Sequence, residues 1–347
     1  MPPSIALASR RATPSANQLI RTTVLRKQRF QQRKGISLRD TLIKPYTAKL
    51  YHRACAWFFD MLSALNLAVP DTIVEFDLLI EDIIVQAWNE GEPRALIGNL
   101  LSGLEHRIAG LRGQMRGSWR LWRHWGSLEI PNRAPPFSLT TLEAVCYCFW
   151  TWGFQHLASV MLVAFDTFMR TGEFCSLTLS QCTFNDDLSV VHIILPATKS
   201  ARRRGGPEGV ACDIPEYVKL LQFISRDLMP GDSLIQVPMV DFRRLFMAAL
   251  NALKLTLPFQ PYSIRRGGAT HYFRICGNMT KVMERGRWSE SRTARIYVNT
   301  ALAELTQLHE SALVVNASKH FRLARQGALQ RGMRGTRARA SRDLVPR

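Results

Sequence analysis

The stretch YSIRRGGATHY, residues 262–272, decides the fold, together with GRW at residues 286–288 and Tyr297. Arg265 lies at the start of a predicted helix. Trp288 follows Arg265 by 23 residues, and Tyr297 follows Trp288 by 9 residues. Taken singly, Trp288 and Tyr297 indicate packing in a core. In this order, a guanidinium, an indole and a phenol form a set that binds and attacks a phosphate.

Two further motifs precede this stretch. Arg170-Thr171-Gly172-Glu173 falls at the end of a predicted helix, and Thr198-Lys199-Ser200 falls at the end of a predicted strand. Lys199 follows Arg170 by 29 residues. Alone, Arg170 is typical of a solvated helix end and Lys199 of a solvated turn. The ordered set predicts that the separated motifs converge on one phosphate.

The ordered set resembles the signature of the tyrosine recombinase/integrase family in its phage integrase-like form. That signature has an arginine in an R-x-G-E-like turn, a hairpin lysine, H-x-x-R, a His or Trp, and a nucleophilic tyrosine. The resemblance covers roughly residues 42–315. It implies a mainly α fold with a small antiparallel β-sheet, in which an N-terminal helical, SAM-like core-binding domain precedes a mixed α+β catalytic domain.

The resemblance implies a role for each catalytic residue. Tyr297 attacks the scissile DNA phosphate and leaves a 3′-phosphotyrosine and a free 5′-hydroxyl. Arg170 and Arg265 hold the non-bridging oxygens of the transition state. Lys199 protonates the leaving 5′ oxygen as general acid. No metal or other cofactor is needed.

Two more positions complete the implied site. Trp288 offers an indole N–H and a flat wall beside the nucleophile, and Glu173 lies behind the site and holds an arginine or a backbone turn in place.

Tyr262 departs from the family pattern, because the H-x-x-R motif reads Tyr262-x-x-Arg265 here. A phenol donates a hydrogen bond to phosphate but is a poor base near neutral pH. His271 lies six residues after Arg265, on a different helical face, and is not expected to replace the imidazole. The context Ser-x-Arg-Arg-Gly-Gly-Ala-Thr resembles eukaryotic mobile-element recombinases more than bacterial integrases.

Basic residues outside the catalytic set are the expected DNA contacts. They lie in the turn between the two predicted strands, next to the second catalytic arginine, and on a tryptophan-rich helix near residues 114–126: Arg202, Arg203, Arg204, Arg266, Arg120 and Arg123. The tryptophans of that helix, Trp119, Trp122 and Trp125, are expected in the core rather than on a base-stacking surface.

The charge of the chain points to a polyanionic partner and argues against an ordinary metabolite enzyme. The 347 residues include 46 Lys+Arg and 27 Asp+Glu, a formal net charge of +19. Residues 1–40 and residues 317–347 each carry nine basic residues and one aspartate. Both ends are therefore expected to be disordered basic arms with sequence-independent DNA affinity.

The domain organisation follows from these patterns. We expect a basic arm over 1–40, a helical core-binding domain over 41–128, a linker over 129–137, a catalytic domain over 138–316 and a basic tail over 317–347. Thr140-Thr141-Leu142-Glu143 is expected to form a capping box at the next helix. Ser189 to Leu195 and Gly209 to Ile214 are expected to pair as strands.

The sequence also bears on disulfide and zinc sites, on a membrane span and on the cellular compartment. The seven irregularly spaced cysteines predict neither a disulfide framework nor a zinc site. Residues 144–165 lack charge, but Gly153 and His156 interrupt them, which favours two buried helices over a membrane span. We expect a nuclear or nucleoid location, with an organellar transit segment at the N-terminus as the alternative.

Four functional hypotheses stay open from the sequence. The first is a site-specific or mobile-element tyrosine recombinase that acts as a homotetramer on paired duplex DNA sites through its C-terminal helix, without a membrane. The second is a catalytically impaired, domesticated DNA-binding protein of the same fold, motivated by Tyr262. The third is a type IB topoisomerase-like enzyme, and the fourth and least favoured is a scaffold that does not bind nucleic acid.

Overall fold

The computed structural model describes residues 16–35, 37, 41–129, 133–196, 198 and 206–342, and it divides the chain into two compact units, Met1–Asn132 and Arg133–Arg347. Helix α1 (Ala16–Arg33) lies within the predicted basic arm. The prediction of disorder is therefore wrong for this interval. Few charges of opposite sign and few apolar residues pointed to disorder, but the segment has no proline or glycine to stop a helix.

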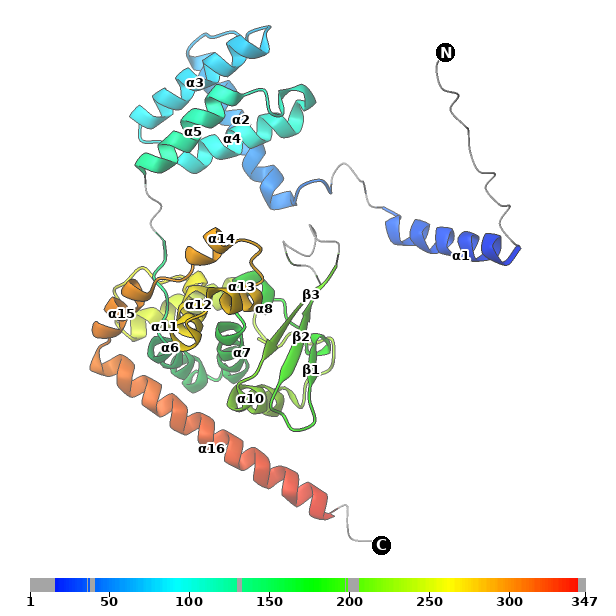
Figure 1. Ribbon diagram of the computed structural model, residues 1–347, viewed down its shortest axis with the longest axis vertical. Coiled ribbons are helices and arrows are strands. Elements are labelled where there is room, and N and C mark those ends of the chain that lie inside the picture. The colour runs from blue at the N-terminus through cyan, green and yellow to red at the C-terminus, as the bar shows by residue number, and fades with distance from the viewer. Residues whose placement is uncertain are drawn as a thin grey trace, which may run out of the picture. The chain divides into compact units, whose positions relative to one another are not determined.

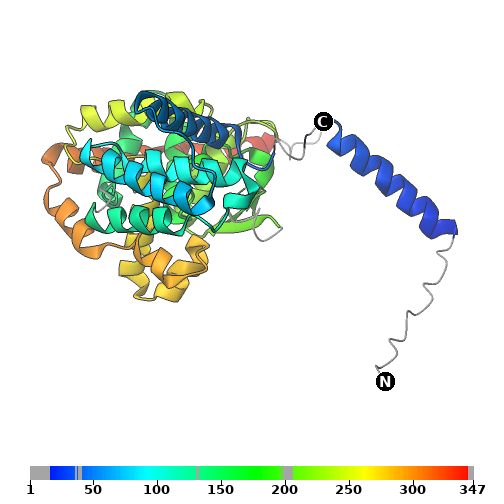
Figure 2. The same ribbon diagram turned by 90° about the horizontal axis from the view of Figure 1, so that it is seen from above.

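Four helices and a short 3₁₀ turn form the rest of the first unit: α2 (Pro45–Ala64), α3 (Ile73–Asn89), α4 (Arg94–Arg107), η1 (Ala109–Leu111) and α5 (Arg116–Leu128). They lie side by side in both views (Figures 1 and 2), with α2 against α4 and α5 against α3 and α4. Pro45 occupies the first turn of α2, where its missing N–H is tolerated. The apolar residues of α3 recur at helical spacing and form its buried face: Phe76, Ile80, Ile83, Ile84 and Ala87.

Helix α5 is fixed by polar contacts at its start and by indoles along its length. The Asp77 carboxylate of α3 accepts hydrogen bonds from the backbone N–H groups of Gly117 and Ser118 at 2.9 and 3.1 Å. Trp125 is buried, and Trp119 and Trp122 pack against the same core. The tryptophans are therefore core residues, as predicted.

The second unit is helical except for one sheet. In chain order it contains α6 (Leu139–Thr151), α7 (Gln155–Asp166), α8 (Thr171–Phe174), η2 (Leu179–Gln181), β1 (Cys182–Phe184), β2 (Val191–Leu195), β3 (Glu208–Cys212), α10 (Pro215–Ser225), α11 (Met239–Ala252), α12 (Tyr262–Cys276), α13 (Met279–Gly286), α14 (Ser291–Arg295), α15 (Thr300–Leu308) and α16 (Ala312–Arg342). The predicted fold class, mainly α with a small antiparallel sheet, is confirmed.

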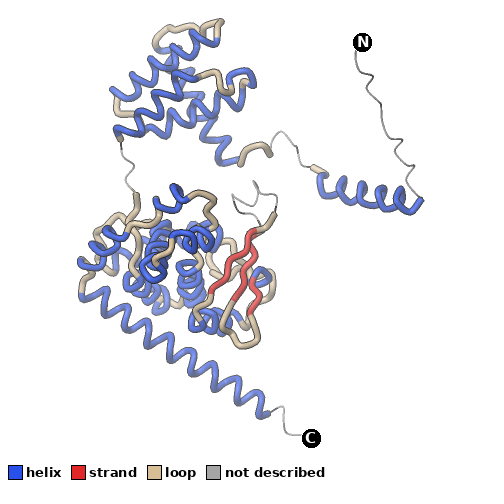
Figure 3. Tube along the Cα trace, viewed as in Figure 1, coloured by secondary structure: helices blue, strands red, loops and turns tan. Residues whose placement is uncertain are grey.

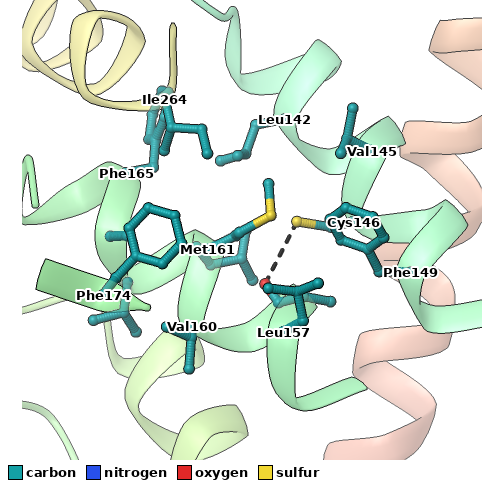
Figure 4. Close-up of a cluster of buried hydrophobic side chains, with 14 of the residues drawn as sticks. Leu142, Val145, Cys146, Phe149, Leu157, Val160, Met161, Phe165, Phe174 and Ile264 are labelled. Carbon is teal, nitrogen blue, oxygen red and sulfur yellow. Dashed lines mark hydrogen bonds between the residues drawn. The ribbon is translucent and has the colours of Figure 1, made fainter. Parts of the chain in front are cut away.

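Helices α6 and α7 form the centre of this unit. Gly153 has a φ of +88° and turns the chain between them, so the uncharged stretch 144–165 forms two buried helices, as predicted. Figure 4 shows their side chains meeting Phe174 and Ile264, and the Cys146 thiol donates to the Ala158 carbonyl at 3.4 Å. Among the helices that the structure describes, none is both long and apolar enough to cross a bilayer.

The sheet has the order β1-β2-β3, with both pairs antiparallel (Figure 3). Val191 pairs with Cys212, and Leu195 pairs with Glu208. The predicted pairing of the two longer strands is confirmed, whereas the three-residue β1 was not predicted because it is too short to show an alternating pattern.

Helix α12 lies close to the backbone of its neighbours. A Cβ at Gly268 would lie 1.9 Å from the Phe165 carbonyl oxygen, and a Cβ at Gly267 would lie 2.3 Å from that of Phe137. Only glycine permits this approach. The Gly-Gly pair therefore fixes the depth at which α12, and Arg265 on it, enters the unit.

The predicted disordered tail is wrong over its described part, because residues 317–331 continue α16. This helix packs along α6 and α10 of the same chain (Figure 1), and it buries Val314, Ala317, Phe321 and Ala328. The prediction rested on the many basic residues of this segment and did not consider its apolar side chains, which recur at helical spacing and bury one face of the helix.

The predicted capping box at Thr140–Glu143 is also wrong. Ser138 caps α6 by accepting from the Thr141 N–H at 2.8 Å. Glu143 lies a turn further in, buried, and its carboxylate accepts from Ser318 and Arg322 of α16, both at 2.7 Å. A carboxylate this deep is held by cations rather than by the start of its own helix.

We expect Glu143→Ala to destabilise the second unit by about 1–3 kcal/mol, because it leaves the buried Ser318 hydroxyl without its acceptor, while the buried Arg325 keeps its ion pair with Glu216 at 2.6 Å. Urea unfolding, with hydrogen exchange of the amides in α6 and α16, measures the change. Arg322 is half-exposed, so Arg322→Gln is the control, with a loss of at most about 1 kcal/mol. Equal losses in the two variants would contradict this account.

Candidate functional site

Arg265 is the centre of the candidate site. Its side chain has no exposed surface, and its guanidinium donates to the carbonyl of Phe168, after α7, and to that of Gly286, at the end of α13, at 2.8 Å for the latter. Burial and then the neighbouring Arg170 and Arg287 lower its pKa to about 10. The group therefore stays charged at neutral pH, and the two carbonyls leave other N–H groups of its fork for a ligand.

The carbonyls reach Arg265 from segments in an unusual backbone conformation. Phe168 has a φ of +50° and Arg287, next to Gly286, has a φ of +60°. Both values lie in the left-handed region, which non-glycine residues adopt at a cost and which clusters at functional sites. The ends of α7 and α13 are thus shaped around this one guanidinium.

The rings of Trp288 and Tyr297 lie beside Arg265. The Trp288 ring centre is 4.7 Å and the Tyr297 ring centre 5.4 Å from its guanidinium carbon. Trp288 and Tyr297 lie 4.5 Å apart between ring centres. Trp288 is buried, and a Cβ on Gly286 would lie 2.0 Å from its ring, so the glycine makes room for the indole.

The hydroxyl groups of Tyr262 and Tyr297 are hydrogen-bonded to each other. Burial and then this hydrogen bond raise the pKa of Tyr262, so its phenol stays protonated near neutral pH. Tyr262 is about one-third exposed, at 37%. The position of the missing imidazole thus holds a neutral phenol in contact with the candidate nucleophile.

Arg170 and Glu173 close the site from α8. The Arg170 side chain donates to Glu173 Oε1 at 2.5 Å, and the Arg170 backbone N–H donates to Oε2 at 2.8 Å. Although burial alone would raise the pKa of Glu173, its bonds to Arg287 and Arg170 lower it. Through these two bonds Glu173 holds the turn that carries Arg170.

Arg287 belongs to the same cluster and was not singled out from the sequence. It donates to Glu173 at 2.7 Å and to Glu208 of β3 at 3.1 Å. Its side chain is 6% exposed. An arginine between Gly286 and Trp288 gives no sequence signal of its own, because its partners lie 79 and 114 residues away.

The charges of this cluster leave a surplus of one positive charge. Three guanidinium groups, those of Arg170, Arg265 and Arg287, meet two carboxylates, those of Glu173 and Glu208. A phosphodiester carries one negative charge, and a phosphoryl-transfer transition state gathers more on its oxygens. The cluster is therefore suited to a phosphate held beside Tyr297.

Six of the other expected residues divide into those outside the described part of the chain and those exposed on α5. Lys199 and the turn residues Arg202, Arg203 and Arg204 lie outside the described residues. Arg120 and Arg123 are exposed on α5 of the first unit, as a DNA contact requires. These roles stay predictions.

Arg266 does not have the exposure expected of a DNA contact. Only 4% of its surface is accessible, and its Nε is buried without a hydrogen-bond partner. It belongs to the face of α12 that the Gly-Gly pair brings into the unit, so it points inward rather than toward a groove.

His271 contacts the Phe165 ring at 5.7 Å between ring centres, and burial and then Arg274 lower its pKa. It is not paired with Tyr297, in agreement with the sequence expectation. In the part of the chain that the structure describes, no group of three or more His, Cys, Asp or Glu side chains is arranged to hold a metal ion.

Comparisons with known proteins agree with this geometry. Residues 154–304 match the model of the Phage integrase family. No curated protein matches the chain at the level of sequence.

Two solved structures share the fold. One is a lambda integrase (75–356) dimer bound to a COC′ core site, with 16% identity, a TM-score of 0.51, and coverage of 81% of this chain and 95% of that one. The other is the Tn1549 transposon integrase in complex with transposon right end DNA, with 12% identity, a TM-score of 0.51, and coverage of 82% and 98%.

We expect Glu173→Gln to weaken the fall in stability with acid. The pKa of Glu173 is lowered in the folded protein from its ordinary 4.5, so its stabilisation is complete above about pH 4.5 and is lost as pH falls through the folded value. The variant should lose about 3 kcal/mol at pH 7 and less at pH 3. Urea unfolding across this range measures the difference; a constant gap between the proteins would contradict the expectation.

Proposed function

We propose that the chain is a tyrosine recombinase, because residues 154–304 match the model of the Phage integrase family, and that it cleaves and rejoins duplex DNA through a 3′-phosphotyrosine at Tyr297. The observation that carries the proposal is the position of Tyr297, whose ring lies beside the buried Arg265 and Trp288 in a cluster with surplus positive charge. A reactive phenol needs this setting to attack a phosphodiester without a cofactor.

In the proposed step, the Tyr297 oxygen forms a bond to phosphorus while the bond to the 5′ oxygen breaks. Arg170 and Arg265 hold the non-bridging oxygens, and the Trp288 indole N–H supports the same group. Lys199, which the sequence places after Thr198, gives its proton to the 5′ oxygen. Rejoining is the reverse of these transfers.

Tyr262 takes part in the departure of the Tyr297 proton. Its raised pKa excludes it as a resting base near neutral pH, but its hydroxyl contacts that of Tyr297 and its ring edge reaches solvent. As Tyr297 attacks, Tyr262 accepts the proton of Tyr297 and releases its own to water. The hydroxyl groups of Tyr262 and Tyr297 thus form a proton relay to water, which takes the place of a general base.

The second hypothesis drawn from the sequence, a catalytically impaired DNA-binding protein, is not favoured by the match to the Phage integrase family. A DNA-binding protein that keeps the phosphate clamp but cleaves too slowly to act as a recombinase needs Arg170 and Arg265 and tolerates a phenol at residue 262. The cleavage experiments below separate the two functions.

Duplex DNA is the proposed partner, and a homotetramer on paired sites is the proposed assembly. Helix α16 packs on its own chain, so its buried face is not free to reach a neighbour. The contact surface we propose is the junction of α15 and α16, where Leu305, Leu308 and Leu313 are exposed. Sedimentation of the chain on DNA that carries one or two sites tests it.

Wild-type protein should form a covalent complex with a nicked suicide duplex, visible on a denaturing gel. Tyr297→Phe should form none, because the phenyl ring has no oxygen to bond to phosphorus, while its affinity for the duplex stays within about twofold of wild type. A library of duplex sequences supplies the substrate. A covalent band from Tyr297→Phe would assign the nucleophile elsewhere, and absence of a band from wild type would favour the DNA-binding function.

Substitutions of Tyr262 test the relay. Tyr262→Phe should slow adduct formation about tenfold by removing one hydrogen bond to the attacking oxygen. Tyr262→His should speed it and add a rise with pH through about 6.5, because a neutral imidazole is a base. Rates from single-turnover trapping between pH 5.5 and 8.5 give both results; identical profiles for all three proteins would exclude a role for residue 262.

The exposed arginines of α5 should contribute to affinity without sequence preference. Arg120→Ala and Arg123→Ala should each reduce the slope of log affinity against log salt concentration by about 1, because each removes one phosphate contact. Fluorescence anisotropy with duplex DNA at several salt concentrations measures the slope. Arg226, an exposed arginine of the second unit away from the site, provides the control as Arg226→Ala.

A further inference from the structure

Arg287 connects two segments whose relative position matters for the proposed cleavage step. One of its terminal nitrogens donates to Glu173 at 2.7 Å and the other to Glu208 at 3.1 Å. Glu173 holds the turn of Arg170, and Glu208 is the first residue of β3. All three side chains are nearly buried, with 6%, 9% and 7% exposed for Arg287, Glu173 and Glu208.

The link continues from Glu208 to the end of the hairpin. Glu208 pairs in register with Leu195, the last residue of β2. Its Oε2 accepts from Arg287 and also from the Thr198 hydroxyl at 2.8 Å. Thr198 is buried and directly precedes Lys199 in the sequence. One carboxylate oxygen therefore connects Arg287 to the residue next to the proposed general acid.

Only an arginine makes this connection. A guanidinium presents two terminal nitrogens in a fixed plane, so it donates to two carboxylates at a fixed separation, whereas a lysine ammonium is a point charge on a flexible stem. Arg287 follows the end of α13 in a left-handed backbone conformation, at a φ of +60°.

We infer that Arg287 is a positioning residue: through Glu208 it fixes Thr198, which directly precedes Lys199 in the sequence, relative to the Arg170 turn, and by this link it sets the efficiency of proton transfer to the leaving 5′ oxygen. The inference rests on the proposed function. Misplacing a catalytic group by about 1 Å slows a reaction by about 10²-fold, so loss of the bridge has a large kinetic effect even where the charge is kept.

A bridging sulfur separates this role from a purely structural or electrostatic one. When sulfur replaces the 5′ oxygen of the scissile phosphate, the leaving group is a thiolate, whose conjugate acid has a pKa near 8.5 and which leaves without protonation. A defect in proton delivery therefore disappears on the sulfur substrate. A defect in phosphate binding, in the nucleophile or in folding affects both substrates alike.

The experiment compares covalent adduct formation by the full-length chain on matched oxygen and sulfur duplexes. Arg287→Lys should slow cleavage of the oxygen substrate by about 10²-fold and of the sulfur substrate by less than about fivefold. Glu208→Gln, which breaks the same link from the other side while keeping the shape of the side chain, should show the same selective loss.

Arg285→Lys is the matched control. Arg285 lies on the same helix and also joins two carboxylates, those of Asp166 and Asp213, at 2.5 and 2.7 Å, but Asp213 follows the opposite end of β3. Its loss should lower thermal stability and leave the ratio of oxygen to sulfur rates at the wild-type value.

Each outcome decides between accounts. The positioning role is supported if the sulfur substrate selectively rescues Arg287→Lys and Glu208→Gln while the ratio of oxygen to sulfur rates in Arg285→Lys stays at the wild-type value. Equal slowing on both substrates, or no slowing on either, overturns it while leaving Tyr297 as the nucleophile. Failure of the wild-type chain to cleave either substrate overturns the proposed function itself, and the role of Arg287 with it.

Discussion

The buried guanidinium of Arg265 is the constraint on which the second unit depends. A charge with no exposed surface must find hydrogen-bond acceptors, and it finds them in the carbonyls of Phe168 and Gly286. Those carbonyls belong to the ends of α7 and α13, so the charge fixes where both helices stop. Three glycines that follow Arg265, namely Gly267 and Gly268 in α12 and Gly286 before Trp288, lie where a Cβ would prevent close packing. The packing of these helices, the left-handed backbone at Phe168 and Arg287, and the shape of the site all follow from the need to give the buried guanidinium its acceptors.

The cost of burying that charge also explains the chemistry. Arg265 is held ionised among other cations, with a lowered pKa, and no carboxylate of the described residues forms an ion pair with it. Glu173 and Glu208 neutralise Arg287 and part of Arg170 instead. An incoming phosphodiester therefore meets a guanidinium that is already oriented and incompletely compensated. Preorganised charge of this kind stabilises a transition state without reorganisation during the reaction.

Much of the fold and of the site could be predicted because its information is local or ordered along the chain. The buried stripe of α3, the break at Gly153 and the pairing of β2 with β3 follow from periodicity and turn residues. The grouping of Arg265, Trp288 and Tyr297 follows from their spacing. The role of Arg287 could not be predicted, because it depends on ion pairs with Glu173 and Glu208, which lie far away in the sequence. The burial of Arg266 was missed for the same reason: residues 263–270 of α12 are all buried, which depends on the segments packed around the helix and not on its own sequence.

The C-terminal helix shows how charge density misleads when it is considered without periodicity. The last 31 residues carry nine basic side chains, and composition alone predicted a disordered tail. Yet the apolar residues Val314, Ala317, Phe321 and Ala328 are buried at helical spacing, and the adjacent cations Arg322 and Arg325 face the buried carboxylate of Glu143. Because Glu143 is on α6, a helix at the centre of the unit, α16 is tied to the same core that supports Arg265 through α7 and α12. Basic residues near the end of the chain therefore serve folding over this interval, and the residues that bind DNA have to be sought where cations are exposed without a carboxylate partner.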